Sequence, residues 1–266
     1  MYQISKQSGC RSTGLVLYSR HIILSFSIPL LSILFGNTGA VLAADATRPT
    51  EVEMVAVMER HYEVTILSHD ALIQGDLDKM RNQLSRIVKQ ALPASAPQSW
   101  MPYHARLHEA ASNGVSRISS MESAGSVMGD VAEACGACHA ALKVGNFYYW
   151  PAPPDEDDKL KTAMRNHQWA SERLWEGVTG PLEEAWFRGA EALAVTRLFE
   201  GDGDTVKDSL RAREDELREM GREAKAATGL HKRAVIYGRL LTTCAGCHQE
   251  AGVTIVPAKS VPLWQE

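Results

Sequence analysis

Two short cysteine–histidine motifs carry the clearest chemistry in this chain of 266 residues. Both have the pattern C-x-x-C-H, at residues 135–139 and again at residues 244–248. Two thiols three positions apart lie on one face of a helical turn, where they can add to the two vinyl groups of one porphyrin. The histidine that follows lies beneath the ring and supplies a nitrogen to the iron. The spacing predicts two covalently bound haem c groups.

The residues that this prediction assigns to cofactor binding are Cys135, Cys138, His139, Cys244, Cys247 and His248. His139 and His248 are the predicted proximal ligands of the haem iron. Other uses of a C-x-x-C pair are a redox dithiol, half of a zinc site or a local disulfide. No strand pattern surrounds either pair, a zinc site made of all four cysteines leaves both histidines unexplained, and a disulfide inside one motif would constrain little chain. A single site or zinc stays open as the alternative.

The composition is that of an ordinary globular protein, with 45% hydrophobic and 23% charged residues and a length that suits one or two domains. The formal net charge is −4 at pH 7, and haem propionates would make it more negative. A negative surface repels nucleic acid and favours encounters with basic patches on proteins. We therefore expect redox partner proteins and no nucleic acid.

The N-terminus has the pattern of an export signal. Basic residues precede an apolar run at residues 22–35, and residues 41–43 before Ala44 resemble a cleavage site. The run is shorter than the roughly 18 residues that span a bilayer. The only cysteine outside the motifs, Cys10, lies in this segment, which suits a mature chain in an oxidising compartment. We expect cleavage after residue 43, a periplasmic protein and no remaining membrane span, with a retained anchor as the alternative.

Apolar residues recur at helical spacing from about Glu51 onward. In the first half, Gly75-Asp76 and Pro93 break the pattern. The helices predicted there begin at about Glu51, run from Leu77 to Leu92 and from Trp100 to about Ile118, and extend from Met121 through Cys138. Asn113-Gly114 weakens the third of them.

A linker with an aromatic cluster at residues 147–150 follows, and then an acidic run at residues 155–158 that suits the first turn of a helix. Breaks at Gly180-Pro181, 201–204 and Gly229 divide the second half into four helical segments. The predicted segments begin near Leu160, run from Leu182 to Phe199 and from Thr205 to Ala227, and start again at Leu230.

The two halves repeat each other at a period of roughly 110 residues, which indicates a duplicated domain. Each half has Met-x-x-His in its first helix, as Met58/His61 and Met164/His167, and C-x-x-C-H in its last. Four amphipathic segments with short breaks suit an antiparallel four-helix bundle around a cofactor. The predicted divisions are a signal peptide at 1–43, a haem-binding bundle at 44–142, a linker at 143–154 and a second haem-binding bundle with a C-terminal tail at 155–266.

This arrangement resembles the class II cytochromes c, the cytochrome c prime group, in which a four-helix bundle carries C-x-x-C-H on its last helix. Class I cytochromes instead place the motif near the N-terminus with a methionine ligand downstream, and no methionine follows His248. The resemblance implies an all-α fold of two tandem antiparallel four-helix bundles, each with a C-terminal haem site. A basic residue four positions after the haem histidine is a family feature that Lys143 matches and Gly252 does not.

The residues on the first helix of each half determine what the haem can do. The resemblance implies either an open distal side of the iron or, in low-spin relatives, a methionine ligand. Met58 and Met164 could supply that methionine, but His61 and His167 lie on the same apolar stripes at matched positions. We expect His61 and His167 to be the distal ligands, with Met58 and Met164, or no protein ligand, as alternatives. The remaining histidines that we interpret as surface or packing residues are His69, His104, His108 and His231.

The sequence thus favours an exported dihaem electron carrier over an enzyme. A gas-binding or gas-sensing protein similar to cytochrome c prime is the first rival, because it needs an open distal site. A dihaem oxidoreductase or peroxidase is the second, although no acid–base pair beside a vacant iron stands out in the sequence. The number of subunits does not follow from the sequence.

Overall fold

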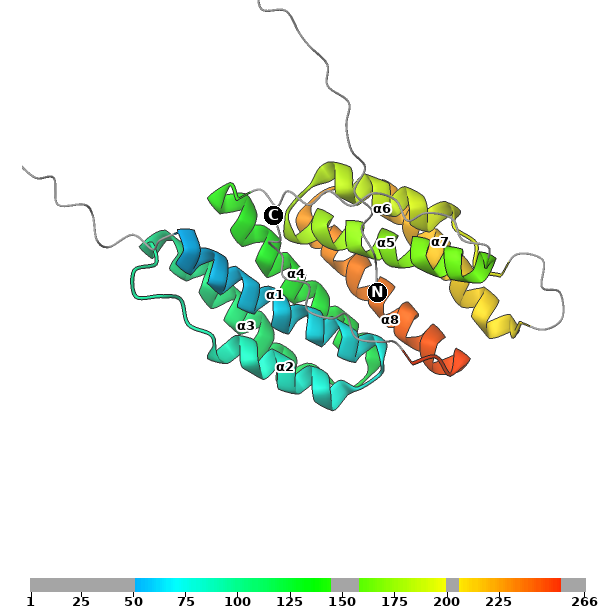
Figure 1. The fold of residues 1–266 in the computed structure, drawn as a ribbon, viewed down its shortest axis with the longest axis horizontal. Helices are drawn as coiled ribbons and strands as arrows, with labels where there is room; N and C mark the ends of the chain where they lie inside the picture. The colour runs from blue at the N-terminus through cyan, green and yellow to red at the C-terminus, as the bar shows by residue number, and fades with distance from the viewer. Residues whose placement is uncertain (1–50, 145–157, 200–205, 255–266) are drawn as a thin grey trace, which may run out of the picture. The chain divides into compact units, whose positions relative to one another are not determined.

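The computed structural model describes residues 51–144, 158–199 and 206–254, which form helices and turns without a strand among them. These ranges contain a short 3₁₀ helix, η1 (Gln98–Trp100), and eight α-helices that belong to one compact unit (Figure 1). The α-helices are α1 (Glu51–Ile73), α2 (Leu77–Lys89), α3 (Met101–Arg117), α4 (Met121–Leu142), α5 (Lys159–Thr179), α6 (Glu183–Val195), α7 (Asp208–Lys225) and α8 (Leu230–Ala251). The prediction of an all-α fold is confirmed. The predicted signal peptide and aromatic cluster lie outside the described residues.

The predicted helix boundaries differ from the observed ones where local backbone chemistry intervenes. Helix α2 ends at Lys89 rather than Leu92, and its C-cap Gln90 is extended, with φ −80° and ψ 124°. Helix α3 continues through Gly114, in agreement with the predicted segment from Trp100 to about Ile118. A Cβ atom at Gly114 would lie 2.4 Å from Val127 Cγ1 of α4. The glycine therefore permits close packing of α3 against α4 and does not end the helix.

Helices α1–α4, the first helix set, correspond in order to helices α5–α8, the second helix set. The paired lengths are 23 and 21, 13 and 13, 17 and 18, and 22 and 22 residues. Within each set, every helix packs against the next one along the chain, and the last packs against the first. Successive helices run in alternating directions (Figure 1). The starts of α1 and α3 therefore meet the end of α4, and the starts of α5 and α7 meet the end of α8.

The two motif helices also end in the same way. Lys143 caps α4 with φ 54°, and Gly252 caps α8 with φ 67°, so both adopt the left-handed conformation. The amide nitrogens of Val144 and Val253 then donate to the carbonyls of His139 and His248, each at 3.0 Å. A side chain in this conformation costs about 1–2 kcal/mol, which glycine avoids. Gly252 therefore suits the end of α8, where the family pattern has a basic residue.

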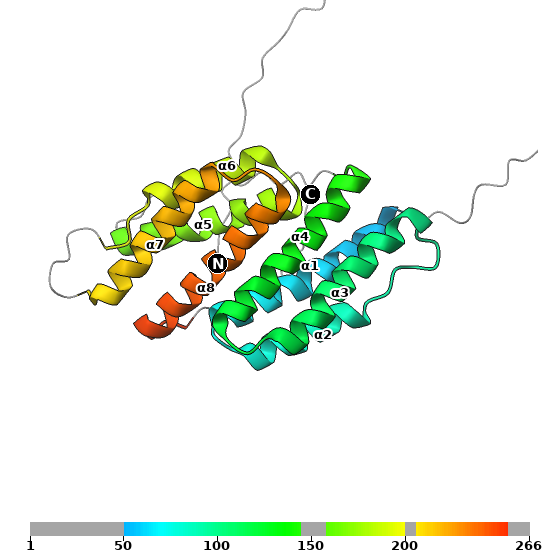
Figure 2. The ribbon, with the colours of Figure 1, turned by 180° about the vertical axis from the view of Figure 1, so that it is seen from behind.

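Helices α4 and α8 pack directly against each other and join the two sets (Figure 2). A Cβ atom on Gly238 would lie 2.4 Å from the Gly125 carbonyl oxygen, and one on Gly129 would lie 2.7 Å from the Ala234 carbonyl oxygen. Since the contact positions increase along one helix and decrease along the other, α4 and α8 run antiparallel. Their two C-x-x-C-H motifs therefore lie toward opposite ends of the α4–α8 pair.

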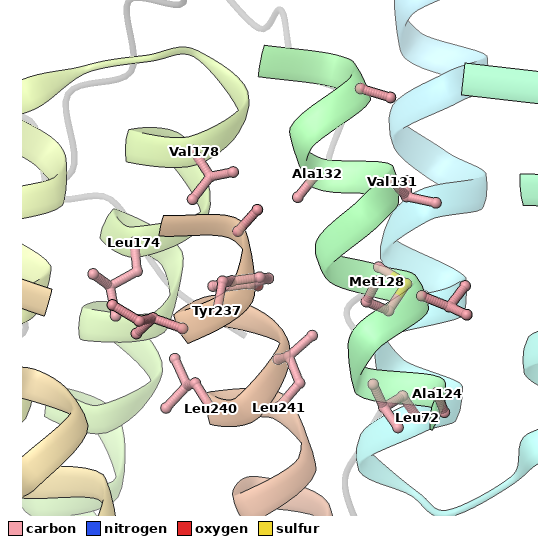
Figure 3. Packing of buried hydrophobic residues seen from close by; sticks show 14 of the residues in the cluster. Leu72, Ala124, Met128, Val131, Ala132, Leu174, Val178, Tyr237, Leu240 and Leu241 are labelled. Atoms are coloured by element: carbon pink, nitrogen blue, oxygen red, sulfur yellow. The ribbon is translucent and has the colours of Figure 1, made fainter. Parts of the chain in front are cut away.

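One cluster of buried apolar side chains runs through this junction into both sets (Figure 3). Leu72 and Met128 contribute from the first set, and Leu174 and Tyr237 from the second. In the second set, Trp186 is fully buried, and its Nε1 donates to the Ala224 carbonyl at 2.8 Å, which ties α6 to α7. Burial of side chains of this size supplies the main stabilising free energy of such a fold.

None of the helices that the structure describes combines the length and apolar character needed to cross a membrane.

Candidate haem sites

The cysteines of both motifs are free thiols on the last turns of α4 and α8. Burial raises the pKa of Cys135 to about 12 and that of Cys244 to about 12. Thiols that act as redox dithiols instead have lowered pKa values, because the thiolate is the reactive form. The environment of these cysteines therefore argues against a dithiol switch. The antiparallel α4–α8 pair also separates the two motifs, which argues against one zinc site made of all four cysteines.

In the described ranges, the side chains of His, Cys, Asp and Glu form no group of three or more that could hold a metal ion. A haem iron takes four ligands from the porphyrin and needs at most two from the protein. Single histidine nitrogens near each motif would therefore be enough to bind the iron.

His139 of the first motif is oriented by the second helix set. Its Nδ1 lies 2.7 Å from the carbonyl oxygen of Thr179, the last residue of α5. Because a carbonyl can only accept, Nδ1 carries the proton, and Nε2 carries the lone pair of the neutral ring. Burial keeps the ring neutral by lowering its pKa, although the hydrogen bond to Thr179 raises it. Histidines that bind metals typically donate their other nitrogen to a carbonyl or carboxylate in this way.

Three further histidines gather at the same end of the first set. The rings of His61 on α1 and His104 on α3 are 5.9 Å apart between centroids, and those of His104 and His108 are 4.0 Å apart. The Nε2 atoms of all three are buried and have no hydrogen-bond partner among the described residues. The pKa of His61 is lowered to about 4. Burial is the largest cause, and the neighbouring rings of His104 and His108 lower the pKa further. His139 also acts on His61 electrostatically, which shows that the cluster lies near the motif.

The structure thus brings the predicted distal residue His61 close to the first motif. Two histidines that the sequence predicts to be surface or packing residues lie there as well. His104 and His108 have no counterparts in the second half, so the internal repeat does not indicate them as ligands. Their spacing of four positions at the start of α3 was the available signal. It places both on one helix face, and the antiparallel order of α3 and α4 brings that face to the motif end.

His167 is the corresponding candidate in the second set. Its side chain hydrogen-bonds to the backbone of Thr196, the C-cap of α6, while its Nε2 is buried without a partner among the described residues. Only 8% of His167 is exposed, whereas Met164 is 36% exposed. Burial lowers the pKa of His167 to about 4. The neutral side chain of His167 therefore lies in the interior of this set, whereas Met164, one turn earlier, lies nearer the surface.

His104 is anchored in a similar way to His167. It hydrogen-bonds to the backbone of Gln90, the C-cap of α2. Gln90 and Thr196 correspond to each other at the offset that relates Met58 to Met164. The C-terminal end of α2 thus holds one ring nitrogen of His104, and the C-terminal end of α6 holds one ring nitrogen of His167.

The two other histidines behave as the sequence predicted. The side chain of His231 is 77% exposed and pairs with Glu133 at 2.7 Å. The ring of His69 stacks on Tyr237, with centroids 6.4 Å apart. His231 lies beside the first motif, because Glu133 is two positions before Cys135, but its side chain is at the surface.

These observations fit a haem at each motif. At the end of the set where the two cysteines lie, each set holds a buried histidine Nε2 that has no hydrogen-bond partner in the described part of the chain. An unpaired buried polar atom costs free energy, and coordination of iron would remove that cost. Comparisons of the chain with protein-family models, with curated proteins and with solved structures give no match.

In the haem-free chain, stability should fall as the pH drops from 6.5 to 4. The pKa of His167 is about 4 in the folded chain and 6.5 in the unfolded chain, so within this window the unfolded state binds more protons. The corresponding loss is about 3 kcal/mol when the window is crossed completely. Urea unfolding of the haem-free chain at pH 7 and pH 4.5 measures it. His61 also has a pKa of about 4 and contributes in the same window. His167→Ala should therefore reduce the pH dependence of the unfolding free energy without abolishing it, and exposed His231→Ala should leave it unchanged. Equal slopes in all three chains would contradict the prediction.

Proposed function

We propose that this protein is an exported dihaem c-type cytochrome that transfers single electrons between redox partner proteins. In this proposal each helix set is a four-helix bundle that holds one haem c, in an arrangement similar to tandem cytochrome c prime domains. The observation that carries the proposal is the buried Nε2 atom of His61 and of His167 at the motif ends of their sets, neither of which has a hydrogen-bond partner within residues 51–144, 158–199 and 206–254. Export to the periplasm rests on the sequence of residues 1–43.

The protein residues would divide the work at each haem. Cys135 with Cys138, and Cys244 with Cys247, would anchor the porphyrin covalently. His139 and His248 would bind one face of the iron, and His61 and His167 the other. The bound iron supplies a one-electron couple between Fe(III) and Fe(II). The helices would hold both histidine nitrogens at the iron and would exclude water from it, so little rearrangement would accompany a change of charge.

Closed axial positions distinguish a carrier from a gas-binding protein or a peroxidase. A carrier needs no vacant coordination position, whereas both rivals need one on at least one iron. His167 has one ring nitrogen anchored and the other buried, and that is the arrangement expected for a ligand whose position is fixed before the iron arrives.

Two measurements on the purified holoprotein test the proposal. Intact mass should show an increment of two haems, and a variant with Cys135→Ala and Cys138→Ala should show one. The optical spectrum of the reduced protein should be the same before and after carbon monoxide is added. An increment other than two haems would reject the haem assignment. Binding of carbon monoxide at both haems would reject the carrier and support the gas-binding protein.

A further inference from the structure

The two proximal histidines differ in a contact that does not follow the internal repeat. His139 Nδ1 donates to the Thr179 carbonyl at 2.7 Å. His248 Nδ1 is also buried, yet it has no hydrogen-bond partner among the described residues. The difference arises because the end of α5 packs onto the first motif: a Cβ atom on Gly136 would lie 2.2 Å from the carbonyl oxygen of Val178.

The acceptor is the C-terminal end of a helix. Thr179 is the last residue of α5, a helix of 21 residues, so its carbonyl is one of the four that have no partner within the helix. The helix dipole places partial negative charge at this end. Thr179 is only 5% exposed, so water screens that charge little. Its hydroxyl donates to the Trp175 carbonyl at 2.9 Å, which holds the last turn in place.

Both effects act on the iron through His139. Donation from Nδ1 to a carbonyl makes the ring a more basic ligand, and a more basic ligand stabilises Fe(III) relative to Fe(II). The negative end of α5 favours the more positive state of the site in the same direction. His248 has neither contribution within the described residues.

We propose that the first haem has a lower reduction potential than the second, so that the half-reduced protein holds its electron at the second haem. This inference rests on the proposed dihaem function. In the step it describes, the Fe(II) of the first haem is oxidised to Fe(III) while the Fe(III) of the second is reduced to Fe(II). One electron moves within the protein, and no other reactant is consumed.

Spectroelectrochemical titration of the holoprotein tests the inference directly. Loss of the hydrogen bond that orients a metal-binding histidine typically costs about tenfold or more in metal affinity or activity. We therefore expect two one-electron waves separated by about tenfold in equilibrium constant, about 59 mV for a single electron. Two haems with one common midpoint would overturn the inference.

Two substitutions identify the haem that gives the lower wave. Gly136→Ala places a methyl group against the Val178 carbonyl and should push α5 away from His139, raising the lower wave toward the upper one. Thr179→Gly adds no atoms but frees the last turn of α5, and it should act in the same direction. Thr179→Ser is the matched control, because serine keeps the hydroxyl that donates to the Trp175 carbonyl.

The outcomes separate this inference from the proposed function. Intact mass first establishes that each variant carries two haems; a chain without them rejects the proposed function itself. If both haems are present and the two waves stay unchanged in Thr179→Gly and in any folded Gly136→Ala protein, the inference is wrong. Movement of the upper wave in these variants would overturn it as well. Movement of the lower wave alone in these variants, with no change in Thr179→Ser, is the expected result.

Discussion

Replacement of Gly238 by alanine should lower the free energy of unfolding by about 3 kcal/mol, the upper part of the usual range for overpacking. The new methyl group would lie 2.4 Å from the Gly125 carbonyl oxygen, and the atoms it meets are backbone atoms of α4. Neither helix can relieve this contact by rotating a side chain, so α4 and α8 must move apart. Because these helices join the two sets, the shift also disturbs the buried cluster around Met128 and Tyr237.

Urea unfolding of the purified full chain, followed by far-ultraviolet circular dichroism, measures this loss. Gly246→Ala on the same helix is the control, since it gives the same gain in helix propensity, about 1 kcal/mol, and the three atoms nearest its new Cβ belong to the flexible end of the Arg213 side chain. Gly246→Ala should therefore be neutral or stabilising. Similar unfolding free energies for the two variants would mean that α4 and α8 do not approach each other as closely as the structure shows.

The sequence contains the small residues that allow α4 and α8 to approach each other closely, but it does not show that these two helices are in contact. Gly125 and Gly129 are four positions apart, as are Ala234 and Gly238, so each pair lies on one helix face. Such small residues also occur inside ordinary helices. Which face they meet depends on packing between halves of the chain that are far apart in sequence, and periodicity contains no information on that.

The helices themselves could be predicted because their causes are local. Apolar periodicity, the break at Gly75-Asp76 and the capping residues act over a few positions, and they place α1 and α2 almost correctly. The third helix was predicted to run through Gly114 to about Ile118, and α3 spans Met101–Arg117. Glycine usually weakens a helix, but here it makes room for Val127 of α4. A tertiary contact overrode a local preference.

The candidate sites divide in the same way. The two motifs, His61 and His167 could be found from spacing and repetition alone. The bond between His139 and Thr179 could not, because it joins the end of α4 to the end of a helix in the other half. His104 and His108 could not be predicted from the internal repeat, because neither has a matching histidine in the second half. A repeat identifies what the two halves share, and the two halves differ at these histidines.

The second prediction with a large effect uses this difference between the sites. His167→Ala should convert one haem of the two from low spin to high spin and should allow that haem to bind carbon monoxide. Among the described residues, the second set has no other histidine to replace it: His248 is the proposed proximal ligand, and His231 is at the opposite end of α8 with 77% of its side chain exposed. Loss of the distal nitrogen therefore leaves the iron with an open position.

His61→Ala should have a smaller effect. His104 lies next to His61 and has a buried, unbonded Nε2, and the ring of His108 is 4.0 Å from that of His104. A small shift of α3 could bring one of these nitrogens to the iron. We expect the first haem to stay largely low spin in His61→Ala and to become high spin when His104→Ala and His108→Ala are added.

Optical and electron paramagnetic resonance spectra of the holoproteins distinguish these outcomes. His231→Ala is the control for substitution of a histidine and should leave both haems low spin. If the His167→Ala protein stays fully low spin, Met164 is the remaining donor one turn away, and combining His167→Ala with Met164→Leu decides between the two. A low-spin second haem in that double variant would show that its distal ligand comes from outside α5. Equal conversion by His61→Ala and His167→Ala would instead show that His104 and His108 cannot reach the iron, and that the two sites are closed by one histidine each.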